Sequence, residues 1–189
     1  MIDADRARRD STIRIVEGFD AGADGLARKS RALVLGMLAH SATPFSRSQF
    51  TPGHMTCTAL VFHPLDAGVL FMHHHRLEKW LLPGGHVEDT DESLSSAAAR
   101  EAVEETCVRL DPSVAPFLAG IDVHGIPPKR DEPFHLHHDL VWSFRAASPE
   151  IAVTDEAPRV EWVTENEWDR LDVAESIRQS IWRARALRP

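Results

Sequence analysis

Tyrosine is absent from this sequence of 189 residues, and cysteine occurs only twice, as Cys57 and Cys107. Because the cysteines form no CxxC pair, they indicate neither a disulfide framework nor a cysteine zinc site. The lack of tyrosine removes one aromatic side chain that often stacks on a nucleotide base. These absences argue against the small disulfide-rich and cysteine-metal classes of protein.

Long apolar runs are also missing. No stretch approaches the roughly 20 apolar residues that a membrane-spanning helix requires, and residues 1–6 lack the apolar core of a signal peptide. The apolar share of 43% and the charged share of 26% are ordinary for a globular protein. We therefore expect a cytoplasmic protein without a membrane partner.

Positive charge is in short supply. The chain has 21 Lys and Arg residues against 29 Asp and Glu residues, which gives a formal net charge of −8. An acidic protein is a poor general ligand for nucleic acid, because phosphates are bound mainly by Lys and Arg. If this protein acts on phosphates, a divalent metal ion has to supply the missing positive charge.

The first 50 residues differ in pattern from the rest. An apolar stripe at helical spacing lies within residues 24–39 and consists of Leu26, Ser30, Leu33, Val34, Met37 and Leu38. We predict a helical extension and linker over residues 1–50 and a main domain over residues 51–189 that ends in helices. The stripe could pack on the main domain or on a second subunit, so a homodimer is one expected assembly.

From residue 54 the pattern becomes that of β-strands. Runs rich in β-branched or alternating apolar residues, bounded by turn residues, predict strands at 56–62, 69–72, 117–124, 135–145 and 161–163. The proline-rich segment 125–133 predicts an irregular loop, and residues 165–186 predict one or two helices. Strands with helices on both sides indicate an α/β fold, arranged as an α/β/α sandwich.

A carboxylate cluster follows the turn at Gly84-Gly85. Glu101, Glu104 and Glu105 lie on a predicted helix, within an arc of about 100° at 3.6 residues per turn. Three like charges so close repel one another unless a cation lies between them, and hard oxygen ligands suit Mg²⁺ or Mn²⁺. The spacing alone is also compatible with an ordinary solvated helix face.

Together these residues resemble the Nudix box, which is written G-x5-E-x7-R-E-U-x-E-E-x-G-U, with U a bulky apolar residue. The match extends from Gly85 to Val108, and its charged positions are Glu92, Arg100, Glu101, Glu104 and Glu105. Because the motif is long and fixes several charged positions, it favours function over a solvated helix face. The Gly-Gly-His and His-x-His features resemble one subgroup of the family.

The sequence departs from the box at three places. Six residues instead of five separate Gly85 from Glu92, and Asp91 stands at the expected spacing and can share the role of Glu92. Ala102 replaces a bulky apolar residue. Cys107 replaces the Gly that ends the helix, where the backbone normally becomes left-handed. None of the three removes a charged residue of the box.

The resemblance implies a Nudix-like α/β/α sandwich with a mixed sheet, and a hydrolase that cleaves the pyrophosphate bond of a nucleoside diphosphate linked to another group. It implies Mg²⁺ (or Mn²⁺) as cofactor and a small nucleotide as the partner. The implied metal ligands are Glu101, Glu104, Glu105 and the Gly85 carbonyl. Glu104, Glu101 and Arg100 are the implied catalytic residues. Glu92 is expected to support Arg100 or a water molecule.

The general base is left open by the resemblance. The family places it variously, at a box glutamate such as Glu104 or at a carboxylate of a later loop. Glu132 and Asp139 are the candidates for the second arrangement.

The eleven histidines are the second unusual feature. His135, His137 and Asp139 alternate along one predicted strand and therefore share a face. We expect His86, His135 and His137, with Arg130 from the preceding loop, to line the substrate groove. An exposed strand face and a metal site are the alternatives. Residues two apart on a strand are separated by about 6.6 Å and residues four apart by about 13 Å, so one ion could join two of the three strand residues.

Two other functions of the same fold are compatible with the sequence. An isomerase resembling the isopentenyl diphosphate isomerases would use Cys57 and a histidine-rich metal site, but those isomerases depart from the box that is complete here. A nucleotide-sensing module without catalysis is the other, but such modules usually lose the box glutamates.

Overall fold

A computed structural model describes residues 2–75, 77–129 and 132–187 of the chain. In chain order the elements of the described residues begin with helices, continue with two groups of strands separated by a helix, and end with helices. They are α1 (Ile2–Gly18), α2 (Gly25–His40), β1 (Gly53–Phe62), β2 (Val69–His74), β3 (Lys79–Leu81), β4 (Gly84–His86), α3 (Leu94–Thr106), β5 (Phe117–Ile126), β6 (His135–Arg145), β7 (Arg159–Val163), the 3₁₀ helix η1 (Glu165–Glu167) and α4 (Glu175–Leu187).

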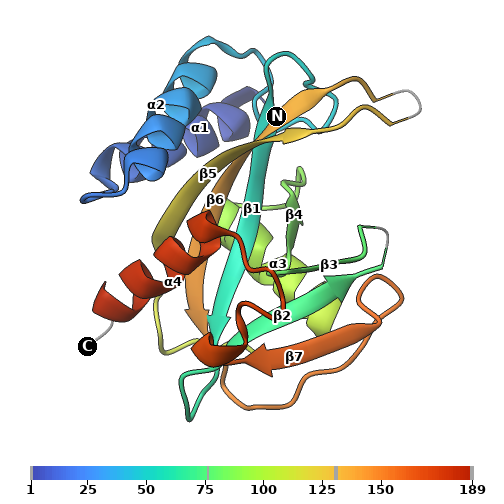
Figure 1. The fold of residues 1–189 in the computed structure, drawn as a ribbon. Helices are drawn as coiled ribbons and strands as arrows, with labels where there is room; N and C mark the ends of the chain where they lie inside the picture. The colour runs from blue at the N-terminus through green and yellow to red at the C-terminus, as the bar shows by residue number, and fades with distance from the viewer. Residues whose placement is uncertain (1, 76, 130–131, 188–189) are drawn as a thin grey trace.

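The strands form one mixed sheet of seven strands with the order β3-β2-β1-β6-β5, in which β4 also pairs with β1 and β7 with β2 (Figure 1). The central strands β1 and β6 are parallel, whereas the other pairs are antiparallel. The predicted strands are all present. Strand β5 extends into the segment expected to be an irregular loop, because Gly125 and Ile126 continue its pairing with β6.

Helices cover both faces of the sheet, as the sequence predicted. The alanines Ala97, Ala98 and Ala102 of α3 are buried in one core with Cys57 and Leu140 of the central strands. Helix α4 packs on the opposite face, where Ile181 and Ala184 share a second core with residues of β1, β2 and β6 such as Leu60, Phe71 and Val141. Alternation along β1 and β6 directs successive side chains to the two cores.

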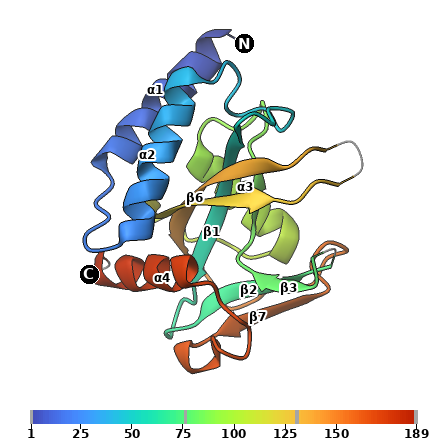
Figure 2. The ribbon, with the colours of Figure 1, turned by 45° about the horizontal axis from the view of Figure 1, so that its top comes forward.

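Helices α1 and α2 lie side by side and pack beside the sheet (Figure 2). The Asp24 side chain caps α2 by accepting hydrogen bonds from the Leu26 and Ala27 N–H groups. The buried residues of α2 are Ala27, Ser30, Val34, Met37 and Leu38. They belong to the core that contains α3, so this face of α2 packs within the chain.

The predicted stripe on α2 was wrong at two positions. Leu26 and Leu33 are 59% and 52% exposed, respectively, whereas Ala27 and Val34 are buried. The other four residues of the predicted stripe, Ser30, Val34, Met37 and Leu38, are buried, and Ala27 joins them on the packed face. The boundary predicted between residues 50 and 51 and the homodimer stay predictions. Among the described residues, no helix is long and apolar enough to cross a membrane.

Candidate active site

Helix α3 begins directly after Ser93. Its N-cap is Ser93, whose hydroxyl accepts from the Ser96 N–H, while the Ser96 hydroxyl accepts from the Ser93 N–H. The helix ends at Cys107, which adopts the left-handed conformation at φ 54°. Cys107 therefore retains the stop that Gly gives in the Nudix box, at a backbone cost of roughly 1–2 kcal/mol.

The helix presents its glutamates to the glycines of β4. Glu105 is buried, and its Oε2 accepts a hydrogen bond of 2.9 Å from the Gly84 N–H. The Glu101 side chain is 15% exposed, whereas that of Glu104 is 58% exposed. A Cβ atom at Gly85 would overlap the Glu101 carboxylate. Only glycine therefore leaves room for this carboxylate against the strand.

The charges of these carboxylates are poorly balanced within the protein. Burial and the charge of Glu101 raise the pKa of Glu105 to about 7, despite the hydrogen bond from Gly84. Burial also raises the pKa of Glu101, to which Glu104 and Glu156 contribute, and Arg100 opposes this rise. Carboxylates gathered around a backbone with room for no side chain are a fitting set of ligands for a hard divalent cation.

Arg100 links the glutamates to the loop before α3. Its Nη1 lies 3.1 Å from Glu101 Oε1 and 3.0 Å from Glu104 Oε2. On the other side, Nε and Nη2 donate to the two carboxylate oxygens of Asp91 at 3.1 Å and 3.0 Å. Nη2 also donates to the His86 carbonyl at 2.9 Å. The bidentate pair with Asp91 fixes the plane of the guanidinium group.

Asp91, and not Glu92, holds Arg100. Glu92 is exposed and forms no hydrogen bond or ion pair within the described part of the chain. Of the two partners expected for Glu92, Arg100 is paired with Asp91 instead, and a contact between Glu92 and a water molecule stays a prediction. Five residues separate Gly85 from Asp91, as the box requires, so the extra residue of the box lies between Asp91 and Arg100. Asp91 is 6% exposed, and its buried side chain is positioned to reach the guanidinium.

Residue Arg8 of α1 supports the same loop. This buried arginine donates from Nη2 to the carbonyl of Asp91 at 2.5 Å and to that of Asp89 at 3.2 Å. Its guanidinium also lies 5.4 Å from the centre of the Phe45 ring. The N-terminal helix thus contacts the box directly, through a residue separated from Asp91 by 83 positions.

The histidines gather on the other side of β4. His86 pairs with Thr56 of β1, and His135 and His137 lie on β6. The His86 and His137 rings are 5.4 Å apart between centroids, and those of His135 and His137 are 5.3 Å apart. The structure thus brings together the three histidines that were predicted to line the groove. Arg130 lies outside the described residues.

The expected alternatives for the general base lie apart from the glutamates. Asp139 is buried and accepts from the hydroxyls of Thr56 and Thr58, and burial raises its pKa. Glu132 is exposed, and its backbone is hydrogen-bonded to that of Lys129. Glu156, a loop residue that was not among the predicted site residues, contributes to the raised pKa values of Glu101 and Glu105.

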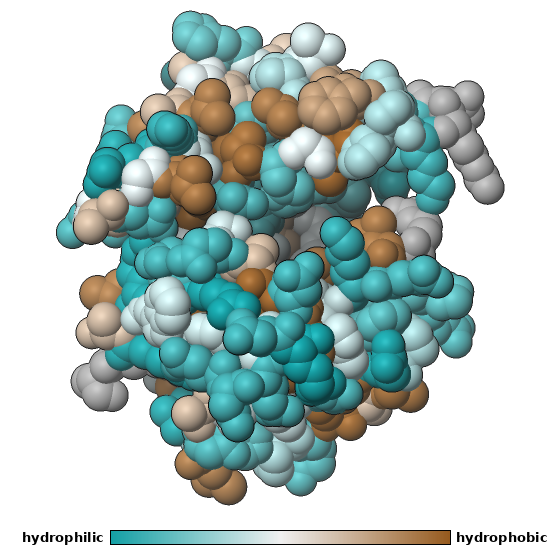
Figure 3. Space-filling model, in the orientation of Figure 1, coloured by the Kyte–Doolittle hydropathy of each residue, from teal (hydrophilic) through white to brown (hydrophobic). Residues whose placement is uncertain are grey.

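The surface is hollowed where β4 lies in Figure 1, and both hydrophilic and hydrophobic side chains border the hollow (Figure 3). Glu104, the most exposed of the three glutamates, lies on the helix that packs against β4.

Comparison with known proteins identifies the family. The model of the NUDIX domain matches residues 54–183, and the chain belongs to this family. The NUDIX domain of Shewanella oneidensis NrtR, complexed with ADP ribose, aligns with a TM-score of 0.54 and 20% identity, over 80% of this chain and 96% of that chain. A NUDIX hydrolase from Nitrosomonas europaea aligns with a TM-score of 0.51 and 21% identity, over 70% and 88% of the two chains.

At these identities the two structures show a shared fold, and a search of curated proteins found no match. The predicted family and the mixed α/β/α sandwich are thereby confirmed. Family membership supports the expected enzyme class, a pyrophosphohydrolase.

Proposed function

We propose that the protein is a hydrolase that cleaves the pyrophosphate bond of a nucleoside diphosphate linked to another group, with Mg²⁺ or Mn²⁺ as its cofactor. The observation that carries this proposal is the arrangement of Glu101, Glu104 and Glu105 against Gly84 and Gly85. Burial and the neighbouring glutamates raise the pKa of Glu105 to about 7. A bound cation would supply the compensating charge that this carboxylate cluster lacks.

The metal would be held by the three glutamates and the Gly85 carbonyl. When bound, such an ion neutralises phosphate oxygens and lowers the pKa of a coordinated water molecule. Glu104 is our candidate for the proton acceptor, because it is the most exposed of the three. Glu156, on the loop before β7, is the alternative. Arg100 positions Glu101 and Glu104 and is itself oriented by Asp91.

The substrate is expected to lie along β4, with its phosphates toward α3 and the rest toward His86, His135 and His137. The similar domain from Shewanella oneidensis was solved with ADP ribose, which makes ADP-ribose the first compound to test here. Neutral imidazoles can donate and accept hydrogen bonds from sugar or base groups.

The isomerase alternative loses support from Cys57. Its thiol is buried and lies 3.6 Å from the Gly85 carbonyl. Burial and the nearby charges of Asp139 and Glu101 hold its pKa well above the ordinary value. A catalytic cysteine needs the opposite, a readily formed thiolate. The chain retains all three box glutamates, which argues against a nucleotide-sensing module without catalysis.

The first experiment compares Glu104→Gln with Glu88→Gln. Each protein is assayed with Mg²⁺ and Mn²⁺ against ADP-ribose, coenzyme A, dinucleoside polyphosphates and nucleoside triphosphates, and the released nucleoside monophosphate or phosphate is measured. We expect Glu104→Gln to lower kcat/KM by at least about 100-fold, since it removes charge that the reaction requires. Glu88 is an exposed acid outside the cluster and its variant should retain wild-type activity.

Full turnover by Glu104→Gln would contradict the assignment of this glutamate. Tight nucleotide binding without turnover under either metal would contradict hydrolysis and favour the sensing module. Interconversion of isopentenyl diphosphate isomers that is lost in Cys57→Ser would establish the isomerase instead.

A further inference from the structure

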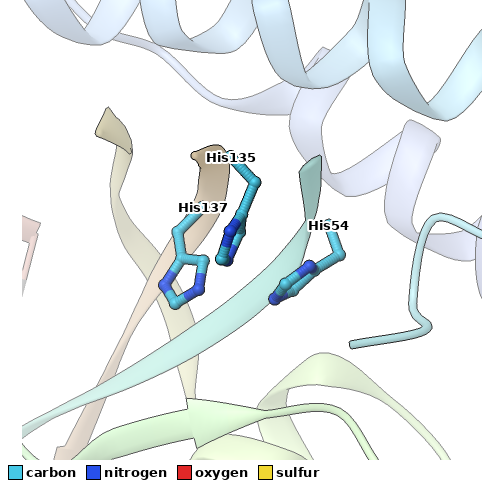
Figure 4. Close-up of side chains that lie close together, drawn as sticks. All are labelled: His54, His135 and His137. Carbon is cyan, nitrogen blue, oxygen red and sulfur yellow. The ribbon is translucent and has the colours of Figure 1, made fainter. Parts of the chain in front are cut away.

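Three imidazole side chains converge on the face of β1 and β6 that is opposite to the face packed against α3. His54 comes from β1, and His135 and His137 come from β6 (Figure 4). Each offers a ligand atom, and these three atoms lie within 4.8 Å of one another. In Figure 4 the rings extend to the same side of the two strands. Histidines that approach from separate strands in this way can surround one small ligand.

The parallel pairing of β1 and β6 creates this arrangement. His54 is the direct partner of His137 in the register, and His135 lies two residues earlier on the same face of β6. The neighbouring Gly53 allows the approach, because a Cβ atom there would overlap the Leu136 carbonyl. Any other residue at position 53 would push the strands apart at the level of the histidines.

Backbone carbonyls fix the orientation of two of the rings. His54 Nδ1 lies 3.1 Å from the Gln49 carbonyl oxygen, and His135 Nδ1 lies 2.8 Å from that of Pro133. A carbonyl only accepts hydrogen bonds, so Nδ1 carries the proton in both rings and Nε2 keeps its lone pair. This pattern, with one ring nitrogen held by a carbonyl, is the usual one for histidines that bind metal ions.

The Nε2 atom of His54 is left without a partner. It is buried and has no hydrogen bond within the described part of the chain. A buried polar atom in this state costs about 1–3 kcal/mol relative to one that is satisfied. The centroid of the His54 ring lies 5.0 Å from that of the His135 ring and 4.9 Å from that of the His137 ring. A metal ion bound among the rings would satisfy this lone pair, as would a hydrogen-bond donor.

We propose that His54, His135 and His137 bind a divalent transition-metal ion of the zinc class, at a site separate from the ions expected at the glutamates. Imidazole nitrogens favour zinc and related ions, whereas carboxylates favour Mg²⁺. Two nitrogens bound to tetrahedral zinc at about 2.05 Å lie about 3.4 Å apart. Ligand atoms at most 4.8 Å apart therefore reach this geometry when each moves by less than about 1 Å.

Three protein ligands leave the fourth position of a tetrahedral ion open, as in catalytic zinc sites. The His86 ring lies 5.0 Å from His54 and 5.4 Å from His137 between centroids. His86 directly follows Gly85, so the histidine site adjoins the strand against which the glutamates pack. An anionic group of the substrate is the class of ligand that suits the open position. The metal site itself does not depend on the proposed hydrolase activity.

The test uses Co²⁺ as a spectroscopic probe for zinc. The purified protein is freed of metal with a chelator, and Co²⁺ is then titrated in the presence of excess Mg²⁺, which occupies the carboxylates. We expect one equivalent of Co²⁺ to bind with the visible spectrum of tetrahedral nitrogen ligation. His54→Gln and His137→Gln should each weaken binding by at least about tenfold. The control His40→Gln, at an exposed position of α2, should bind like the wild type.

Two outcomes would overturn the proposal. One is Co²⁺ binding that persists unchanged in His54→Gln and His137→Gln. The other is binding that excess Mg²⁺ displaces or that Glu105→Gln abolishes, which would locate the ion at the carboxylates. X-ray absorption of the wild-type Co²⁺ protein avoids any folding defect of the variants. A shell of three imidazoles supports the site, and a shell of oxygen atoms without imidazole contradicts it.

Discussion

The carboxylate cluster on α3 and the histidine cluster on β1 and β6 both place like groups close together. The pKa values of their members shift in opposite directions. Glu105 keeps its proton more firmly than usual, with a pKa of about 7 that burial and neighbouring glutamates cause. His137 loses its proton more readily, because burial and four surrounding histidines lower its pKa to about 2. Burial thus disfavours the charged form in both clusters, which raises the pKa of the carboxyl group and lowers that of the imidazole.

The two clusters also differ in what holds them. Arg100 and Asp91 orient the glutamates by ion pairs, and Arg8 supports their loop. Backbone carbonyls of Gln49 and Pro133 orient the histidines. The carboxylate cluster thus relies on a network of charged side chains, whereas the histidine cluster relies on backbone acceptors that fix the tautomer. We therefore expect the metal preferences of the two clusters to depend on their surroundings as well as on ligand type.

The largest effect within this comparison is expected at Asp91. Asp91→Asn removes the charge that orients Arg100, and we expect kcat/KM for pyrophosphate cleavage to fall about 10- to 100-fold. Co²⁺ binding by the histidines should not change. Glu92→Gln is the matched control, because Glu92 is exposed beside Asp91 and should behave as the wild type. Equal losses in both variants would restore Glu92 to the role that the sequence suggested.

A smaller effect is expected at Arg8, and it is a change in stability. Arg8→Ala leaves two carbonyls of the box loop without their charged donor. We expect the free energy of unfolding, measured with urea, to fall by about 1.5–3 kcal/mol. Arg6→Ala is the control, since Arg6 is exposed on the same helix. A loss in Arg6→Ala as large as in Arg8→Ala would show that the effect comes from helix α1 in general.

The smallest effect should appear in the pH dependence of the metal-free protein. The folded-state pKa of Glu105 is raised from 4.5 to about 7, so its contribution to stability is complete below pH 4.5 and is lost as the pH rises through about 7. That of His137 is lowered from 6.5 to about 2, so its contribution is present above pH 6.5 and is lost as the pH falls. The two clusters therefore give opposite slopes.

Urea unfolding across this pH range, with a chelator present, measures the two slopes. Glu105→Gln should remove a decline on the order of 1 kcal/mol toward neutral pH, and His137→Gln should remove a decline of similar size toward acid pH. Identical pH profiles for the wild type and Glu105→Gln would contradict the raised pKa and with it the charge imbalance in the carboxylate cluster.

Much of this molecule could be predicted from its residues. Period-2 and period-3.6 patterns located the strands and the helices, because burial of a face leaves such a pattern in the sequence. The box also identified the family, and its Arg100-Glu101 and Glu104-Glu105 pairs do come together with Gly85. Local spacing is sufficient here, since one helix and the short strand β4, where the sequence suggested a turn, carry all these residues.

The remaining features depend on contacts that spacing does not encode. Asp91 and Glu92 are adjacent acids, and only the path of the loop decides which one reaches Arg100. His54 joins His137 through the register of two parallel strands, and a register is fixed by the whole sheet. Arg8 reaches the box from a separate helix. A signal existed for Asp91, at the expected spacing from Gly85, but none existed in the sequence for Arg8.

The placement of α1 and the α2–β1 loop has a practical consequence. A chain trimmed to residues 54–183, the extent of the family match, would keep the three box glutamates and the three clustered histidines. It would lose Arg8, which holds the loop of the carboxylates, and Gln49, whose carbonyl accepts from His54. The trimmed protein would therefore lack residues that orient both clusters. Metal binding and activity should be measured on the full chain.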